Sequence, residues 1–219
     1  MDTLNFKAVF LGQSVIKYEV PLDVFHSINH IYENNFHSLN PANKQLAGKI
    51  EKEHSLFYDG EDESRMKRHS LIPTNVQQWF MNVYHHYLNW NKIKGYKTHL
   101  NSVWVNEMKQ HEYNPIHVHQ GSIFTGLSSV MMLKLPTNYG VEYSAVESPS
   151  NGTLQILGSS SGQFANVDYK PNLKERDFYV FPYDMRHTVY PFNSTDEVRR
   201  TLAANCDVEY NPINNRGAE

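Results

Sequence analysis

Hydrophobic positions recur at helical spacing in two stretches of the first half of the chain. In the first, Pro21 stands where a first helical turn tolerates proline. The apolar positions that follow are Leu22, Phe25, Ile28, Ile31 and Tyr32. In the second, which begins near Pro73-Thr74-Asn75, they are Val76, Trp79, Phe80, Val83, Tyr84 and Tyr87. Steps of three and four residues mark one apolar face of each helix, so we expect both helices to cover a sheet.

The rest of the N-terminal region has weaker patterns. Residues 6–18 are rich in Val, Ile, Phe and Tyr, which favours one or two strands. Residues 38–72 are polar and rich in turn residues, so we interpret them as a loop with room for a short helix. Together, residues 1–95 are predicted to form a helical and strand-containing support region.

From about residue 98 onward, short β-branched and aromatic segments alternate with turn signals. The predicted strands are 99–109, 114–119, 126–135, 141–147, 153–157, 163–168, 177–182, 187–191 and 198–208. About eight short strands at this spacing favour a double-sheet jelly roll. We therefore expect a mainly β fold with flanking helices, in which residues 96–210 form the jelly-roll core and residues 1–219 form a single domain.

Composition narrows the class of protein further. Hydrophobic residues make up 40% and charged residues 20% of the 219 residues, which is enough for a packed core. The net charge is −3 and the basic residues are scattered, which argues against a nucleic-acid partner. The single cysteine, Cys206, excludes an intramolecular disulfide and a cysteine-rich zinc site.

The sequence also argues against a membrane location. No apolar run approaches the ~20 residues that span a bilayer. The N-terminus lacks the basic start and long apolar run of a secretory signal. We expect a cytoplasmic protein without a membrane partner, and its oligomeric state stays open.

Candidate metal ligands appear within residues 114–119. In a strand, His117 and His119 would point to the same face and could bind one ion. Imidazole suits iron, zinc, copper or nickel. His-x-His alone is a weak signal, because surface or hydrogen-bonded histidine pairs look the same. His187 strengthens it, since a jelly roll brings distant strands together and His187 lies in a distant predicted strand.

A candidate anion site follows in Arg199-Arg200-Thr201. Strand alternation puts Arg199 and Thr201 on one face and Arg200 on the other. A guanidinium offers two parallel donors to a carboxylate, and a hydroxyl two residues later can add a third. We predict that Arg199 and Thr201 bind a carboxylate of a dicarboxylic acid. Arg200 is the alternative if the register shifts, and a surface salt bridge is the alternative role for Arg199.

Other polar residues near these motifs could line the site, cap turns or support the fold. They are Asn106, Glu107, His111, Asn114, Asn205 and Asp207. The His85-His86 pair is expected on the surface of the second helix. The small hydroxyl residues within 122–129 could leave room for a substrate.

Several of these segments resemble one oxygenase family. The matching segments are 104–106, 111–115, 117–119, 128–136, 181–182, His187, 189–194 and 199–201. They are similar to the 2-oxoglutarate-Fe(II) oxygenases, many of them phage-encoded, that are distant relatives of prolyl 4-hydroxylases. The resemblance covers roughly the last half of the chain.

The resemblance implies a double-stranded β-helix of cupin-like type, an Fe(II) cofactor and 2-oxoglutarate bound through Arg199. It also implies that His117 and His187 are iron ligands. The wider superfamily has His-x-Asp or His-x-Glu where this chain has His117-Val118-His119. We expect His119 to be the third ligand, and the alternatives are a carboxylate from elsewhere or a position that stays open.

The reaction expected from this resemblance is hydroxylation of a C–H bond in a peptide or small-molecule substrate, with O₂ as oxidant. One alternative is a three-histidine cupin-type dioxygenase that does not use 2-oxoglutarate. Another is a non-enzymatic jelly-roll module for binding or structure, whose histidines only pack.

Overall fold

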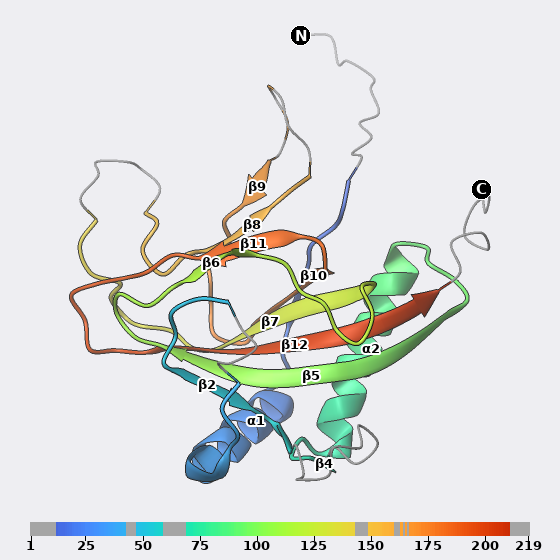
Figure 1. The fold of residues 1–219 in the computed structure, drawn as a ribbon, viewed down its shortest axis with the longest axis horizontal. Coiled ribbons are helices and arrows are strands. Elements are labelled where there is room, and N and C mark those ends of the chain that lie inside the picture. Colours follow the sequence, from blue (N-terminus) through green and yellow to red (C-terminus); the bar gives the residue numbers. More distant parts are fainter. Residues whose placement is uncertain are drawn as a thin grey trace, which may run out of the picture.

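Two antiparallel sheets face each other, and two helices lie on the outer side of the larger sheet (Figure 1). The computed structural model describes residues 12–42, 47–58, 69–142, 149–159, 163, 165 and 167–210. The paired sheets confirm the predicted mainly β jelly roll with flanking helices.

The larger sheet has six strands in the order β1-β10-β7-β12-β5-β2. Every neighbouring pair is antiparallel. The bounds are β1 Ile16–Glu19, β2 Lys52–Ser55, β5 Tyr96–Met108, β7 Gly126–Lys134, β10 Asp177–Pro182 and β12 Arg199–Tyr210. The three longest strands, β5, β7 and β12, correspond to the predicted strands 99–109, 126–135 and 198–208.

The smaller sheet has the order β6-β11-β8-β9. Its strands are β6 Asn114–His117, β8 Leu154–Leu157, β9 Asp168–Tyr169 and β11 Arg186–Val189. The predicted strand 114–119 is therefore shorter than expected, and the predicted strand 163–168 overlaps β9 only at residue 168, with residues 164 and 166 outside the described part. The predicted strand 141–147 has no counterpart at residues 141 and 142, and the remainder of it lies outside the described residues.

Both predicted helices form. They are α1 Leu22–Asn35 and α2 Thr74–Trp90, and a short 3₁₀ helix, η1 Phe36–Ser38, follows α1. Pro21 and Pro73 occupy the N-cap positions, one residue before the predicted first turn. A proline costs little there, because the first backbone N–H groups of a helix have no partner within the helix.

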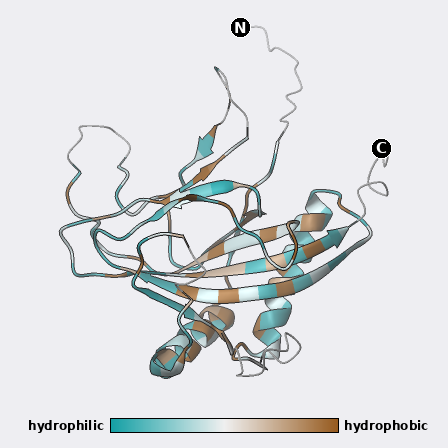
Figure 2. Cartoon of the chain, in the orientation of Figure 1, coloured by the Kyte–Doolittle hydropathy of each residue, from teal (hydrophilic) through white to brown (hydrophobic). Residues whose placement is uncertain are grey.

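The faces of β12 show why the helices lie where they do. Leu202, Ala204 and Cys206 point to the helix side and belong to the core that includes α1 and α2. The residues that alternate with them, Thr201, Ala203 and Asn205, point into the space between the two sheets. Figure 2 shows hydrophobic and hydrophilic positions alternating along the long strands of the larger sheet.

Each side of the larger sheet has its own core. On the helix side, Phe80 packs edge-on against Phe178, and the hydroxyl groups of Tyr84 and Ser129 are 2.8 Å apart. Between the sheets lies a second cluster of buried residues: Ile50, Met108, Met132, Leu154, Ile156, Tyr179, Phe181, Met185, Val189 and Phe192. This second core leaves the space between the sheets partly open.

The structure differs from the prediction over residues 38–72. Its described residues, 38–42, 47–58 and 69–72, contain β2, β3 Phe57–Tyr58 and β4 His69–Ser70 where the prediction had a loop with a short helix, and residues 43–46 and 59–68 lie outside the described part. Lys52–Ser55 contains no β-branched or aromatic residue, so its local β propensity is low. Pairing with β5 makes it a strand, and that contact depends on the tertiary fold. β1 and β2 thus bring the N-terminal region into the jelly-roll sheet.

Phe80→Ala is expected to reduce the free energy of unfolding by about 3–5 kcal/mol, the usual cost of truncating a buried phenylalanine. Phe80 is fully buried beneath the sheet. Trp90→Ala, at the end of the same helix, is the control, because 70% of the Trp90 surface is exposed. Urea denaturation of both variants measures the effect, and equal losses would contradict this description of the core.

Candidate metal centre

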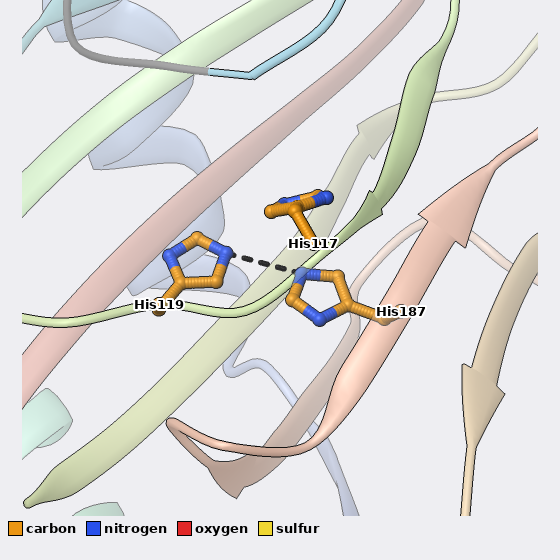
Figure 3. A group of neighbouring side chains, drawn as sticks. All are labelled: His117, His119 and His187. Carbon is orange, nitrogen blue, oxygen red and sulfur yellow. Dashed lines mark hydrogen bonds between the residues drawn. The ribbon is translucent and has the colours of Figure 1, made fainter.

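Three imidazole rings meet between the two sheets (Figure 3). One ring nitrogen from each of His117, His119 and His187 lies within 4.8 Å of the other two. The Nε2 atoms of His119 and His187 are 3.1 Å apart. The ring centroids of His117 and His187 are separated by 4.2 Å. Residues up to 70 positions apart in the sequence thus form one compact cluster.

Backbone pairing positions two of the rings. His117 and His187 are direct partners in the β6–β11 ladder. The Nδ1 of His117 lies 2.7 Å from the carbonyl oxygen of Pro115, and the Nδ1 of His187 lies 3.0 Å from that of Met185. A carbonyl oxygen only accepts, so each Nδ1 carries the proton. The Nε2 atom of each ring then has a free lone pair that can bind a metal.

His119 reaches the cluster in another way. The predicted strand 114–119 ends at His117, so His119 lies beyond β6 and simple strand alternation does not orient it. Its backbone N–H donates to the carbonyl oxygen of Tyr183. Its ring stacks on Trp104 of β5, with ring centroids 5.7 Å apart. Packing against the larger sheet therefore holds this ring in place.

Burial keeps the three rings neutral. Desolvation lowers the pKa of His117. Desolvation, with the neighbouring His187 and His117, holds the pKa of His119 well below its usual value. Desolvation and the nearby His117 lower the pKa of His187 to about 3. All three imidazoles are therefore unprotonated near neutral pH, which is the state that binds metal ions.

The cluster opens into a cavity of about 310 Å³ between the sheets. The residues that line it are Ala47, Ile50, Glu53, Trp104, Asn106, Met108, Asn114, His117, Val118, His119, Gln120, Ser128, Ser129, Val130, Leu154, Phe181, His187, Val189, Arg199, Thr201, Ala203 and Asn205. Besides the histidines, the ionisable groups in this lining are Arg199 and Glu53. The lining thus mixes apolar side chains with an at least equal number of polar ones, and these polar groups can fix the orientation of a small ligand.

Arg199 is buried in this cavity without a carboxylate partner among the described residues. Only 2% of its surface is exposed. Its Nε has no hydrogen-bond partner, and its Nη2 contacts only the sulfur of Met132, at 3.7 Å. Desolvation lowers the pKa of Arg199 to about 10, so the guanidinium still carries its charge at neutral pH. An unpaired buried charge of this kind favours binding of an anion.

The two neighbours of Arg199 on β12 lie on opposite faces. Thr201 is buried and lines the same cavity. Arg200 points to the helix side, where its Nη1 lies 2.9 Å from a carboxylate oxygen of Glu33 and its Nε lies 3.1 Å from one of Glu107. The structure therefore places Arg200, the alternative anchor, outside the cavity.

The other polar residues named from the sequence divide between the cavity and the scaffold. Asn106, Asn114 and Asn205 line the cavity, and each has a buried side-chain oxygen without a partner in the described part of the protein. Glu107 faces the helix side, Asp207 accepts a hydrogen bond from Tyr183, and His111 is exposed. Of the serines within 122–129, Ser128 and Ser129 belong to the cavity lining, but the hydroxyl of Ser129 points to the helix side, where it lies 2.8 Å from that of Tyr84. His86 is exposed on α2, and His85 is only partly so.

Sequence reasoning missed Glu53, the only acidic residue among the described residues that line the cavity. It lies on β2, within the stretch predicted as a loop. Burial and the nearby charge of Glu112 raise the pKa of Glu53 to about 7. The sequence carries no signal for this position, because only the pairing of β2 with β5 turns Glu53 toward the cavity.

The donor set fits a first-row divalent metal. Three neutral imidazole nitrogens suit iron, zinc, copper or nickel. Metal–imidazole bonds are about 2.1 Å long. Two such nitrogens at right angles on one ion are therefore roughly 3.0 Å apart, close to the 3.1 Å between His119 and His187. Among the described residues, no carboxylate joins this group.

Residues 102–205 match the model of a protein family described as "Putative 2OG-Fe(II) oxygenase". The matched stretch contains all three histidines, Arg199 and Thr201. The match confirms the family resemblance seen in the sequence motifs and supports an oxidoreductase. Together with the histidine group, it bears out the expectation of Fe(II) and 2-oxoglutarate. No curated protein sequence matches the chain.

Solved structures share the fold over most of the chain. A prolyl-4-hydroxylase from Pseudomonas putida has a TM-score of 0.55 and 13% identity, covering 90% of this chain and 92% of its own. A Burkholderia pseudomallei oxidoreductase of the 2OG-Fe(II) oxygenase family has a TM-score of 0.50 and 10% identity, with coverages of 88% and 84%. A Trichoplax adhaerens prolyl hydroxylase, in complex with a peptide fragment of hypoxia inducible factor, has a TM-score of 0.53 and 10% identity, with coverages of 90% and 83%. These similarities confirm the double-stranded β-helix.

Among the described residues, no helix is both long enough and apolar enough to cross a bilayer. The cytoplasmic location stays a prediction.

The raised pKa of Glu53 predicts how stability depends on pH. The folded protein holds this proton up to about pH 7, whereas the ordinary pKa is 4.5. The contribution of Glu53 to the free energy of unfolding therefore falls as pH rises from about 4.5 to 7. In urea denaturation of the metal-free protein, Glu53→Gln should match the wild type near pH 5 and exceed it at pH 7.5.

Glu51→Gln is the control for this measurement. Its hydrogen bond and charge interaction with Lys109 lower the pKa of Glu51, so its contribution to stability is present at neutral pH and lost in acid. The Gln variant should therefore be weakened slightly at pH 7.5 and not at low pH. The same trend in both variants would show that Glu53 is not desolvated as described.

Proposed function

We propose that this protein is an Fe(II)- and 2-oxoglutarate-dependent dioxygenase that hydroxylates a C–H bond of a peptide or small-molecule substrate. The observation that carries the proposal is a pair of features in one cavity. Three neutral imidazoles converge there, and Arg199, buried without a carboxylate partner among the described residues, lines the same space. The family match supports the same reaction class.

In this proposal His117, His119 and His187 hold the iron. The carbonyl oxygens of Pro115 and Met185 fix the proton on Nδ1 of His117 and His187, which keeps Nε2 free for the metal. Trp104 and Phe181 pack against the rings of His119 and His187 and limit their rotation. With only three protein ligands, such a metal would keep positions that the protein does not fill, and there it would supply the oxidation chemistry.

Arg199 and Thr201 bind the far carboxylate of 2-oxoglutarate. The guanidinium contributes charge and two parallel donors, and the hydroxyl on the same face of β12 adds a third. The apolar residues around them, Met108 and Met132, exclude water and strengthen this ion pair. Arg200 cannot take this role while it pairs with Glu33 and Glu107 on the other face.

When bound, iron and 2-oxoglutarate supply the oxidation. O₂ and 2-oxoglutarate are consumed, succinate and CO₂ are released, and one oxygen atom enters the substrate C–H bond as a hydroxyl group. The protein supplies position and a cavity with little water. The Trichoplax relative holds a peptide fragment, which is consistent with a peptide substrate for this chain.

Adding Fe(II) and 2-oxoglutarate without O₂ is expected to produce a visible charge-transfer band at one equivalent of iron. His187→Ala or His117→Ala should abolish the band and stoichiometric iron binding, because two imidazoles remain. His111→Ala, an exposed histidine outside the cavity, is the control and should retain both.

Two results of this titration would contradict the proposal. Iron binding without a band, and without succinate once O₂ is admitted to the same sample, would favour a three-histidine dioxygenase that does not use 2-oxoglutarate. No iron binding at all would leave only a non-enzymatic role for the jelly roll.

Arg199→Ala is expected to raise the KM for 2-oxoglutarate by about 10- to 100-fold, the range for losing a hydrogen bond to a charged group. Initial rates of succinate formation measure this change. Arg200→Gln is the matched control, since its side chain lies on the helix face, and it should leave the KM near the wild-type value. An unchanged KM in Arg199→Ala would show that the co-substrate is anchored elsewhere.

A further inference from the structure

Glu53 is a buried acid that the proposed reaction does not use. Only 4% of its surface is exposed, and it lines the cavity that holds the three histidines. Within the described part of the chain, no hydrogen bond or ion pair reaches its carboxyl group. Glu112, another buried carboxylate, does have partners, because it accepts hydrogen bonds from the backbone N–H groups of Glu51 and Lys109. Glu53 therefore lacks a structural role of that kind.

Strand register places a second acceptor beside Glu53. Glu53 is the direct partner of Asn106, and Asn106 is the direct partner of Thr201. The three side chains form a row across β2, β5 and β12 on the cavity face. The Oδ1 of Asn106 is buried and has no partner among the described residues. Directly opposed side chains in a sheet lie about 5 Å apart at Cβ, so one small group can contact both acceptors.

The charges in the cavity indicate which chemical group would contact both Glu53 and Asn106. In the proposed function, Arg199 is occupied by the carboxylate of 2-oxoglutarate, so it is not available to Glu53. Three neutral imidazoles add no negative charge to the iron. An unpaired carboxylate in such a place is costly, and a cationic hydrogen-bond donor offsets the cost best. A primary ammonium group has three donors and full positive charge.

We propose that Glu53 and Asn106 bind a primary ammonium group of the substrate, so that the oxygenase acts on an amine, such as an amino acid or a peptide with a free amino group. This inference rests on the proposed function, in which a C–H bond elsewhere in the same substrate is hydroxylated. β2 lies two strands from β12, roughly 10 Å at about 4.8 Å per strand. Between them, next to the His119 ring, lies Trp104, whose buried Nε1 also lacks a partner in the described residues. The substrate thus extends from β2 past Trp104 toward the histidines.

The proposal is tested with matched probes in which acetylation removes the ammonium charge, one charge in the first pair and two in the second. n-Butylamine is compared with N-butylacetamide, and L-lysine with its Nα,Nε-diacetyl form, by ligand-observed NMR. Each is titrated into the wild type with and without Fe(II) and 2-oxoglutarate, under anaerobic conditions. Glu53→Gln keeps the shape and removes the charge, and Glu53→Asp keeps the charge on a shorter side chain. Glu107→Gln makes the same change on the other face of the sheet, where Glu107 pairs with Arg200.

The amine of each pair should bind the wild type more tightly than its acetylated form. Glu53→Gln should weaken amine binding by about 10- to 100-fold and leave the acetylated probes unchanged. Glu53→Asp should be intermediate, and Glu107→Gln should resemble the wild type. A second readout is the infrared C=O stretch of the protonated Glu53 carboxyl group. This band is assigned by its absence from the spectrum of Glu53→Gln. Near neutral pH this band should disappear when butylamine binds, which a purely structural carboxyl group would not show.

The inference is overturned if the wild type shows no preference for the charged probes, including the case in which none binds. It is also overturned if Glu53→Gln binds the amines as tightly as the wild type. Preference for the acetylated probes would mean that a protonated Glu53 donates to a neutral carbonyl group instead.

The iron and 2-oxoglutarate band, recorded in the same samples, separates the two proposals. If the band forms without amine preference, only this inference fails. If it does not form, the proposed function fails and the amine result is judged on the metal-free protein.

Discussion

The pairing of β12 with β5 and β7 at the centre of the larger sheet determines most of the structure. Side chains alternate along β12, so Leu202 and Ala204 join the core beneath the helices while Arg199 and Thr201 enter the cavity. A shift of one residue would exchange the two faces and bury Arg200 in the cavity. The register is therefore fixed by apolar packing on the helix side. Arg199 and Thr201 reach the cavity because of this packing, and they do not themselves have to stabilise the register.

Much of this arrangement could be predicted from the sequence, because the responsible signals are local. The apolar faces of the two helices and the aromatic, β-branched strands β5, β7, β10 and β12 follow from short-range periodicity. The position of His119 could not be predicted in the same way, since the strand ends at His117 and stacking on Trp104 orients the ring. β2 was missed because its residues have little β propensity. Glu53 was missed with it, because only a long-range pairing turns it inward.

The cavity contains opposite charges that do not pair with each other among the described residues. Arg199 and Glu53 both line it, and each is almost fully buried. Bringing them together would stabilise the fold but would block the site. The protein instead keeps both groups apart on rigid strands and accepts the cost of desolvation. Such sacrifices of stability are typical of binding sites, where ligands complete the missing interactions.

The three histidines do not depend on the scaffold to the same degree. His117 and His187 face each other across a hydrogen-bonded strand pair, so moving either ring means moving the smaller sheet. His119 lies past the end of β6 and is held by a backbone hydrogen bond to Tyr183 and by ring contacts with Trp104, His117 and His187. A different side chain at position 119 would leave the strand ladder intact. The electronic character of the proposed metal site could therefore be changed, in evolution or by design, through this single residue, while the architecture around it stays the same.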